Sequence, residues 1–129
     1  MNHVYILGGL RSYIGVKDGM YRHIPAEKLG AEVLREVVSR FELPTDAIDY
    51  IIGGNAVGGG GNITRLAALS AGFPERIPAV TLDLQCGSAL EAISAAAAKI
   101  ESGMADLVIA GAHRKSTKVY LSPDQWDFK

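Results

Sequence analysis

The sequence predicts an α/β fold with a mainly parallel, layered sheet. Short apolar runs that end at glycine alternate with longer stretches of helical periodicity along most of the chain. The last of these helical stretches is long enough to cross between two parallel strands. Alternating strands and helices are typical of α/β domains, in which helices cover the faces of the sheet.

The 129 residues fit a single domain, taken as residues 1–129. The 13 basic and 14 acidic residues are interspersed and give a net charge of -1, so neither nucleic acid nor a membrane is expected as a partner. No signal peptide and no apolar stretch of about 20 residues is evident. The single cysteine excludes an intramolecular disulfide, and no metal-ligand spacing is present. We therefore expect no metal and a reducing, cytoplasmic setting.

Two strands and two helices are predicted in the first half of the chain. Residues 3–8 form an apolar run ended by two glycines, which is typical of a buried strand. Pro25 begins a helix whose apolar positions recur up to Phe41, with charges on its other face, so this helix belongs to an outer layer. Residues 48–52 predict a second strand and residues 62–71 a second helix, closed by a glycine and a proline.

Four consecutive glycines, residues 58–61, lie between that strand and that helix. Such a run could cradle a phosphate through its backbone N–H groups. It lacks the Lys-Ser/Thr ending of a P-loop and the spacing of a dinucleotide fingerprint. We interpret it as a tight structural loop, because glycine permits unusual dihedral angles and close backbone approach.

The second half predicts a strand over residues 79–84, a helix over 88–102, a turn at Gly103 and a strand over 107–110. The helix carries only three charges and has small residues on nearly every side. A helix that is apolar all round is typically buried. We expect it to form a middle layer, which would need a second sheet that this chain does not supply.

Cys86 lies where the third predicted strand stops and this helix begins. The free N–H groups and the dipole of a helix N-terminus favour negative charge, so a thiol here is biased toward the nucleophilic thiolate. Gly87 would allow a sharp turn that places the sulfur at the end of the strand, where ligands of α/β sheets bind. The alternative is a small buried hydrophobic residue, which is the commoner role of a lone cysteine.

Four segments in order resemble the thiolase family. The opening strand and turn, the start of the first helix, the Asn-x-x-Arg segment with its Ala-Gly-Phe-Pro turn, and the Cys-Gly-Ser-Ala nucleophile turn are similar to thiolase motifs; they are residues 4–15, 25–30, 61–74 and 86–93. The chain departs from the family pattern at Tyr13, where proline is usual, at Ala89, where glycine is usual, and at Arg114, where glutamate is usual.

The resemblance implies a thiolase-like layered fold with a buried central helix, of which only the N-terminal half is present, without the loop domain and the C-terminal domain. It implies that Cys86 takes an acyl group from an acyl-CoA substrate and passes it on in a ping-pong cycle. Coenzyme A thioesters are then substrates, no cofactor is bound permanently, and no coenzyme A-binding residue is assigned. His3, His23 and His113 are expected to be solvated or structural, although His113 lies on the ligand side of the sheet.

Three functions remain open at this point: a thiolase fragment or subunit that needs its missing half, a non-catalytic thiolase-like assembly module, and a fragment of a ketoacyl-synthase-type condensing enzyme. The strand over residues 79–84 resembles the thiolase strand that pairs across a dimer axis, and an unpaired apolar edge promotes association. We therefore expect a homodimer or higher oligomer, a complementary C-terminal half, or both.

Overall fold

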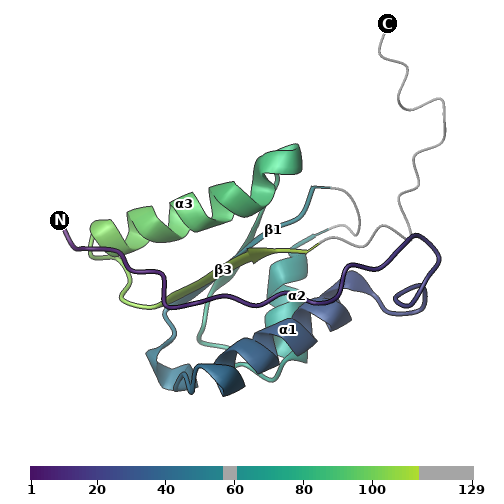
Figure 1. The fold of residues 1–129 in the computed structure, drawn as a ribbon. Helices are drawn as coiled ribbons and strands as arrows, with labels where there is room; N and C mark the ends of the chain where they lie inside the picture. The colour runs from purple at the N-terminus through teal and green to yellow at the C-terminus, as the bar shows by residue number, and fades with distance from the viewer. Residues whose placement is uncertain (57–60, 114–129) are drawn as a thin grey trace, which may run out of the picture.

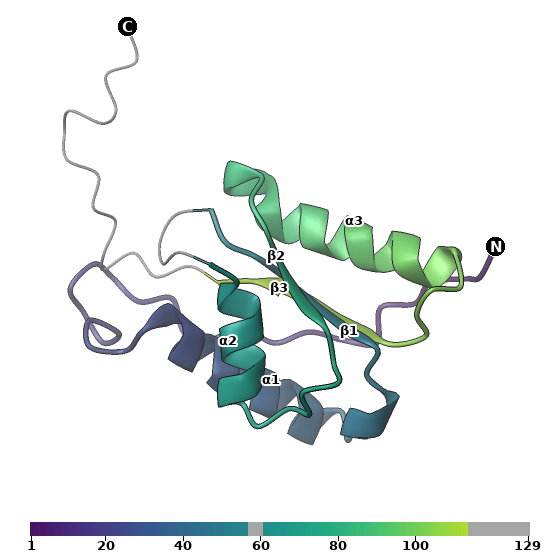
Figure 2. The same cartoon turned by 180° about the vertical axis from the view of Figure 1, so that it is seen from behind.

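The chain forms a parallel three-stranded sheet with helices on both faces (Figures 1 and 2). The computed structural model describes residues 1–56 and 61–113. The strand order is β2-β1-β3, and both neighbours run parallel to β1. The elements are α1 (Ala26–Arg40), a 3-10 turn η1 (Thr45–Ala47), β1 (Tyr50–Gly54), α2 (Ile63–Ser70), β2 (Ala79–Leu82), a 3-10 turn η2 (Gln85–Gly87), α3 (Ser88–Glu101) and β3 (Val108–Ala112). The predicted α/β class with a parallel sheet is confirmed.

Two apolar cores lie on the two faces of the sheet. Ile51 points into the core under α1 and α2, where it packs with Ala67 and Phe73. Ile52, the next residue, points into the core under α3, where it packs with Ala92. Because successive side chains of a strand point to opposite faces, β1 is buried on both sides and reads as a continuous apolar run.

The three helices begin and end within one residue of the predicted bounds, and β1, β2 and β3 begin and end within two residues of theirs. β1 extends through Gly53 and Gly54, which were predicted to stop it. β2 ends at Leu82 and not at residue 84. The N–H groups of Leu84 and Gln85 bind side-chain oxygens of Ser88 and Asp83, so they do not continue the ladder.

The strand predicted over residues 3–8 is not formed. This segment runs past the outer edge of β3 (Figure 1) without joining the sheet, and Tyr5, Ile6 and Leu7 are exposed. A strand needs a neighbour to pair with, and a groove separates this segment from β3. Residues 58–60 of the glycine run lie outside the described residues, while Gly61 has a φ of +80°, as the loop interpretation requires.

Helix α3 is covered on one side only. Ala92 and Ala96 are buried against the sheet, whereas Leu90 is 70% and Ile93 is 46% exposed. The prediction that α3 forms a middle layer is therefore confirmed for the face that packs on the sheet. No described part of the chain covers its opposite face. Over the same residues, none of the helices has the length and apolar character needed to cross a bilayer.

Candidate active site

The carboxyl ends of all three strands lie level at one edge of the sheet. Gly54, the last residue of β1, pairs with Leu82 of β2 and with Ala112 of β3. The Asn55 N–H donates to the Leu82 carbonyl at 2.9 Å, and the His113 N–H donates to the Gly54 carbonyl at 2.8 Å. Ligands of parallel α/β sheets bind at this edge, and the segment that carries Cys86 follows directly from β2.

The turn around Cys86 bends at Gln85. Gln85 has a φ of 50°, in the left-handed region, and begins the 3-10 turn η2 that contains Cys86. Gly87 was predicted to provide the sharp bend, but its φ of -88° is open to any residue. The prediction placed the bend two residues too late because glutamine gives no sequence signal for a left-handed conformation.

Three hydrogen bonds from two side chains hold this turn. The Ser88 hydroxyl accepts from the Leu84 N–H at 2.9 Å and donates to the Gln85 carbonyl at 2.7 Å. The Asp83 carboxylate accepts from the Gln85 N–H at 2.9 Å. The N–H groups of Leu84 and Gln85 and the carbonyl of Gln85 therefore have partners close in sequence, as stable turns require.

Gly54 lets the start of α3 rest directly on the end of β1. A Cβ at residue 54 would lie 2.6 Å from the Ser88 carbonyl carbon and 2.7 Å from its Cβ. Carbon atoms cannot approach so closely, so any larger residue at 54 would displace the start of α3. The sheet edge thereby fixes the position of the Cys86 turn.

Cys86 is exposed. This finding contradicts the alternative interpretation of Cys86 as a small buried hydrophobic residue. An exposed thiol between the end of a strand and the start of a helix can be reached by an incoming electrophile and can attack it. The arrangement can present a nucleophile at the ligand-binding edge of the sheet.

Asn62 and Arg65, the polar residues of the Asn-x-x-Arg segment, have structural partners. The Asn62 side chain accepts from the Arg65 N–H at 3.1 Å, which caps α2, and donates to the Ala79 carbonyl at 2.8 Å. The Arg65 guanidinium donates to the carbonyls of Ile77 and Glu75 at 2.7 and 2.9 Å. This segment ties α2 to the loop before β2 and so supports the strand that leads to Cys86.

His113 is largely buried between α1 and the sheet, on the face opposite α3. A Cβ at Gly30 of α1 would overlap the His113 ring, and one at Gly53 of β1 would lie 3.0 Å from His113 Nε2. The imidazole therefore occupies the space that these two glycines leave between α1 and the sheet, on the face opposite α3. Burial lowers the pKa of His113 below its ordinary value of 6.5, and the nearby Glu27 carboxylate partly opposes this shift.

The other two histidines are at the surface, as predicted. His3 is exposed and its ring lies 6.4 Å from that of Tyr5. His23 is exposed and accepts a hydrogen bond from Arg22 Nε at 2.9 Å. Within residues 1–56 and 61–113, no three His, Cys, Asp or Glu side chains come together in a group that could hold a metal ion.

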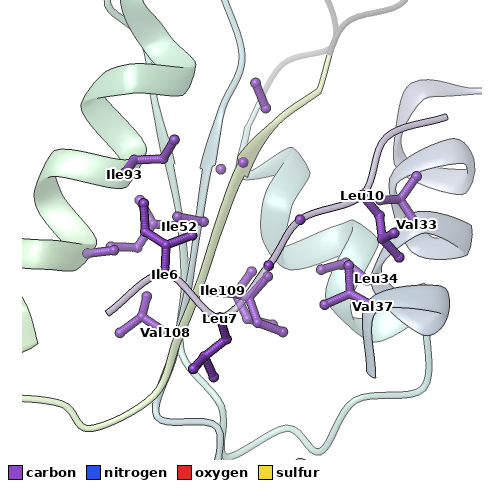
Figure 3. Close-up of a pocket in the computed structure, with 18 of the residues that line it drawn as sticks. Ile6, Leu7, Leu10, Val33, Leu34, Val37, Ile52, Ile93, Val108 and Ile109 are labelled. Carbon is purple, nitrogen blue, oxygen red and sulfur yellow. The ribbon is translucent and has the colours of Figure 1, made fainter. Parts of the chain in front are cut away.

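An apolar groove of about 1030 Å³ opens between residues 3–12 and the free edge of β3. Figure 3 shows Ile6 and Leu7 of the N-terminal segment beside Val108 and Ile109 of β3, with Ile93 of α3 at one end. At the other end Leu10 lies beside Val33 of α1 (Figure 3). The groove thus separates an unpaired strand edge from an extended apolar segment.

Ser88, Asp83 and Gly54 are the parts of the site that the sequence interpretation missed. Ser88 entered the sequence analysis only within the Cys-Gly-Ser-Ala motif, and Asp83 only as part of the strand predicted over residues 79–84. A serine two residues after a cysteine at a helix start is a local signal for a side-chain bond to the turn. Gly54 gave no such signal, because its contact with Ser88 joins segments far apart in sequence.

These features define an α/β protein that exposes a cysteine thiol at a strand-to-helix turn. The model of the thiolase N-terminal domain family matches residues 4–125. The chain therefore belongs to the thiolase family, and the resemblance predicted from its motifs is confirmed.

Relatives of known name and a solved structure agree with this assignment. The steroid 3-ketoacyl-CoA thiolase FadA6 of Mycobacterium tuberculosis is 38% identical over 125 residues, which are 95% of this chain and 31% of the relative. YhfS of Bacillus subtilis is 39% identical over 118 residues, 92% of this chain and 31% of that protein. The crystal structure of the Bacillus anthracis acetyl-CoA acetyltransferase superposes with a TM-score of 0.77 at 31% identity, covering 87% of this chain and 29% of that one. The chain thus spans less than a third of each.

Proposed function

We propose that this chain is the part of a thiolase that carries the acyl-accepting nucleophile, and that Cys86 is this nucleophile. The exposed thiol of Cys86, at the carboxyl edge of the sheet, is the observation that carries the proposal. Membership of the thiolase family supports it, and so does the similarity to an acetyl-CoA acetyltransferase. The substrates would be acyl thioesters of coenzyme A.

The proposed chemistry is a transfer between thioesters. The Cys86 thiolate attacks the carbonyl carbon of an acyl-CoA, a new carbon–sulfur bond forms, and the bond to the coenzyme A sulfur breaks. Coenzyme A leaves as a thiolate and takes a proton from water or from an acid. The acyl group on Cys86 then passes to a second acceptor, and Cys86 is regenerated.

We further propose that a partner completes the fold. Three apolar surfaces support this: the groove beside β3, the exposed face of α3 with Leu90 and Ile93, and β2 as the other edge strand of the sheet. Apolar surfaces of this kind are typical of interfaces, and an open strand edge invites pairing. A second copy would pair at β2, and a complementary half would cover α3 and the groove. The proteins that resemble this chain are about three times as long.

An assembly module without chemistry is the second candidate, favoured by the same three apolar surfaces. Protection of Cys86 from alkylation separates the two functions. Preincubation with acetyl-CoA should block later labelling of Cys86 by iodoacetamide, because the acyl group occupies the sulfur. Free coenzyme A is the matched control and should not block labelling. Equal labelling after both treatments would favour the assembly module.

A further inference from the structure

The turn that carries Cys86 contains one residue in a costly backbone conformation. Gln85 has a φ of 50°, where its Cβ crowds the following carbonyl group. Its side chain is exposed, so packing of the side chain does not hold it there. A strained residue persists only where neighbouring groups determine its conformation, and such residues are found preferentially at functional sites.

The hydroxyl of Ser88 spans this residue. It accepts from the N–H of Leu84 at 2.9 Å and donates to the carbonyl of Gln85 at 2.7 Å. The hydroxyl cannot keep both bonds if the backbone of Gln85 rotates to an ordinary φ, because this rotation moves the N–H of Leu84 relative to the carbonyl of Gln85. Ser88 is only 4% exposed, so water cannot readily replace its hydroxyl in these bonds.

Ser88 is in turn fixed to the sheet. Its backbone rests on Gly54 at the end of β1, so close that a Cβ on residue 54 would lie 2.6 Å from the Ser88 carbonyl carbon. The Ser88 hydroxyl therefore connects a rigid point on the sheet edge to the backbone on both sides of Gln85. Cys86 is the next residue along the chain and takes its position from this connection.

We infer that Ser88 is a positioning residue for Cys86: its hydroxyl keeps Gln85 in the left-handed conformation and thereby holds the thiol at the carboxyl edge of the sheet. The importance of this position for acyl transfer rests on the proposed function. The geometric role of Ser88 can be tested without acyl transfer, because Cys86 is the only cysteine of the chain.

The test compares the alkylation rate of Cys86 by iodoacetamide in the folded full chain with the rate in urea. Ser88→Ala should lower this ratio about tenfold, the order expected for losing one or two neutral hydrogen bonds. Adding Gln85→Gly to Ser88→Ala should restore most of the ratio, because glycine adopts a positive φ without strain. If Ser88 only stabilised the fold, thermal stability would fall, the ratio would stay unchanged, and Gln85→Gly would rescue nothing.

A second variant decides the matter if Ser88→Ala does not fold. Gln85→Val changes an exposed side chain but disfavours a positive φ, so it should fold by circular dichroism and lose reactivity as Ser88→Ala would. Gln85→Gly alone should keep the wild-type ratio. A wild-type ratio in Gln85→Val would overturn the inference. Failure of the wild-type chain to accept an acyl group would instead refute the proposed function and leave these ratios interpretable.

Discussion

The Ser88 backbone rests on the bare Cα of Gly54, with 2.6 Å between the Ser88 carbonyl carbon and the position that a Cβ on residue 54 would take. This contact joins the end of β1 to the start of α3, two segments that the sequence does not connect. It sets the height of the Cys86 turn above the sheet edge.

Gly54→Ala should therefore destabilise the chain and displace Cys86. Overpacking of this kind typically costs about 1–3 kcal/mol. Urea unfolding measures the loss, and the alkylation rate of Cys86 measures the displacement. Gly111→Ala is the matched control, because a Cβ at this strand glycine meets nothing within 4 Å. Equal stability of the two variants would show that α3 can move without cost.

The neutral form of His113 should stabilise the fold above about pH 6.5. Burial lowers the pKa of His113 in the folded chain below the ordinary value of 6.5, so the unfolded chain binds a proton more readily as the pH falls. The contribution is complete above 6.5 and is lost progressively below it. The urea midpoint should therefore fall between pH 7.5 and pH 5.

Replacement of the two histidines separates their effects on this pH dependence. His113→Gln should reduce the fall of the urea midpoint, because glutamine cannot gain a proton. His23→Gln should leave the fall unchanged, since His23 is exposed. A full pH dependence in His113→Gln would assign the effect to other groups, such as the carboxyl of Asp49, whose pKa is lowered chiefly by hydrogen bonds from the backbone N–H groups of Asp106 and Leu107.

The chain alone should not turn over acetoacetyl-CoA. The chain spans 31% of the related thiolase FadA6, and each positioned acid or base contributes about 100-fold to 10,000-fold to the rate of an enzyme. Thiolytic cleavage followed by absorbance should remain at the level of the Cys86→Ser variant. Cleavage well above that level would show that this chain holds a sufficient set of catalytic groups.

The chain should also associate at micromolar concentration. The open edge of β2, the apolar groove beside β3 and the exposed face of α3 leave apolar surface that a partner would remove from water. Sedimentation equilibrium should give a mass above that of the 13.7 kDa monomer. A monomer that unfolds cooperatively on heating would contradict this prediction, because it would show that the chain is stable while these surfaces stay exposed to water.

Local patterns predicted the helices well, because capping and periodicity are properties of neighbouring residues: Pro25 and Asn62 lie at the N-caps of α1 and α2. The prediction of a strand over residues 3–8 was wrong, because strand pairing depends on a neighbouring strand that local sequence does not encode. The position of Cys86 followed from the strand-to-helix alternation. The bend at Gln85 and the contact of Gly54 with Ser88 could not be predicted from this alternation, because both depend on tertiary packing.

Intact-mass analysis of the folded chain after exposure to acetyl-CoA tests the proposed role of Cys86 most directly. We expect one acetyl group per chain, mapped by peptide analysis to Cys86, formed faster in the folded chain than in urea and absent from Cys86→Ser. An acetyl group at another residue, or equal rates in the folded and unfolded chains, would contradict a positioned acyl-accepting nucleophile at Cys86.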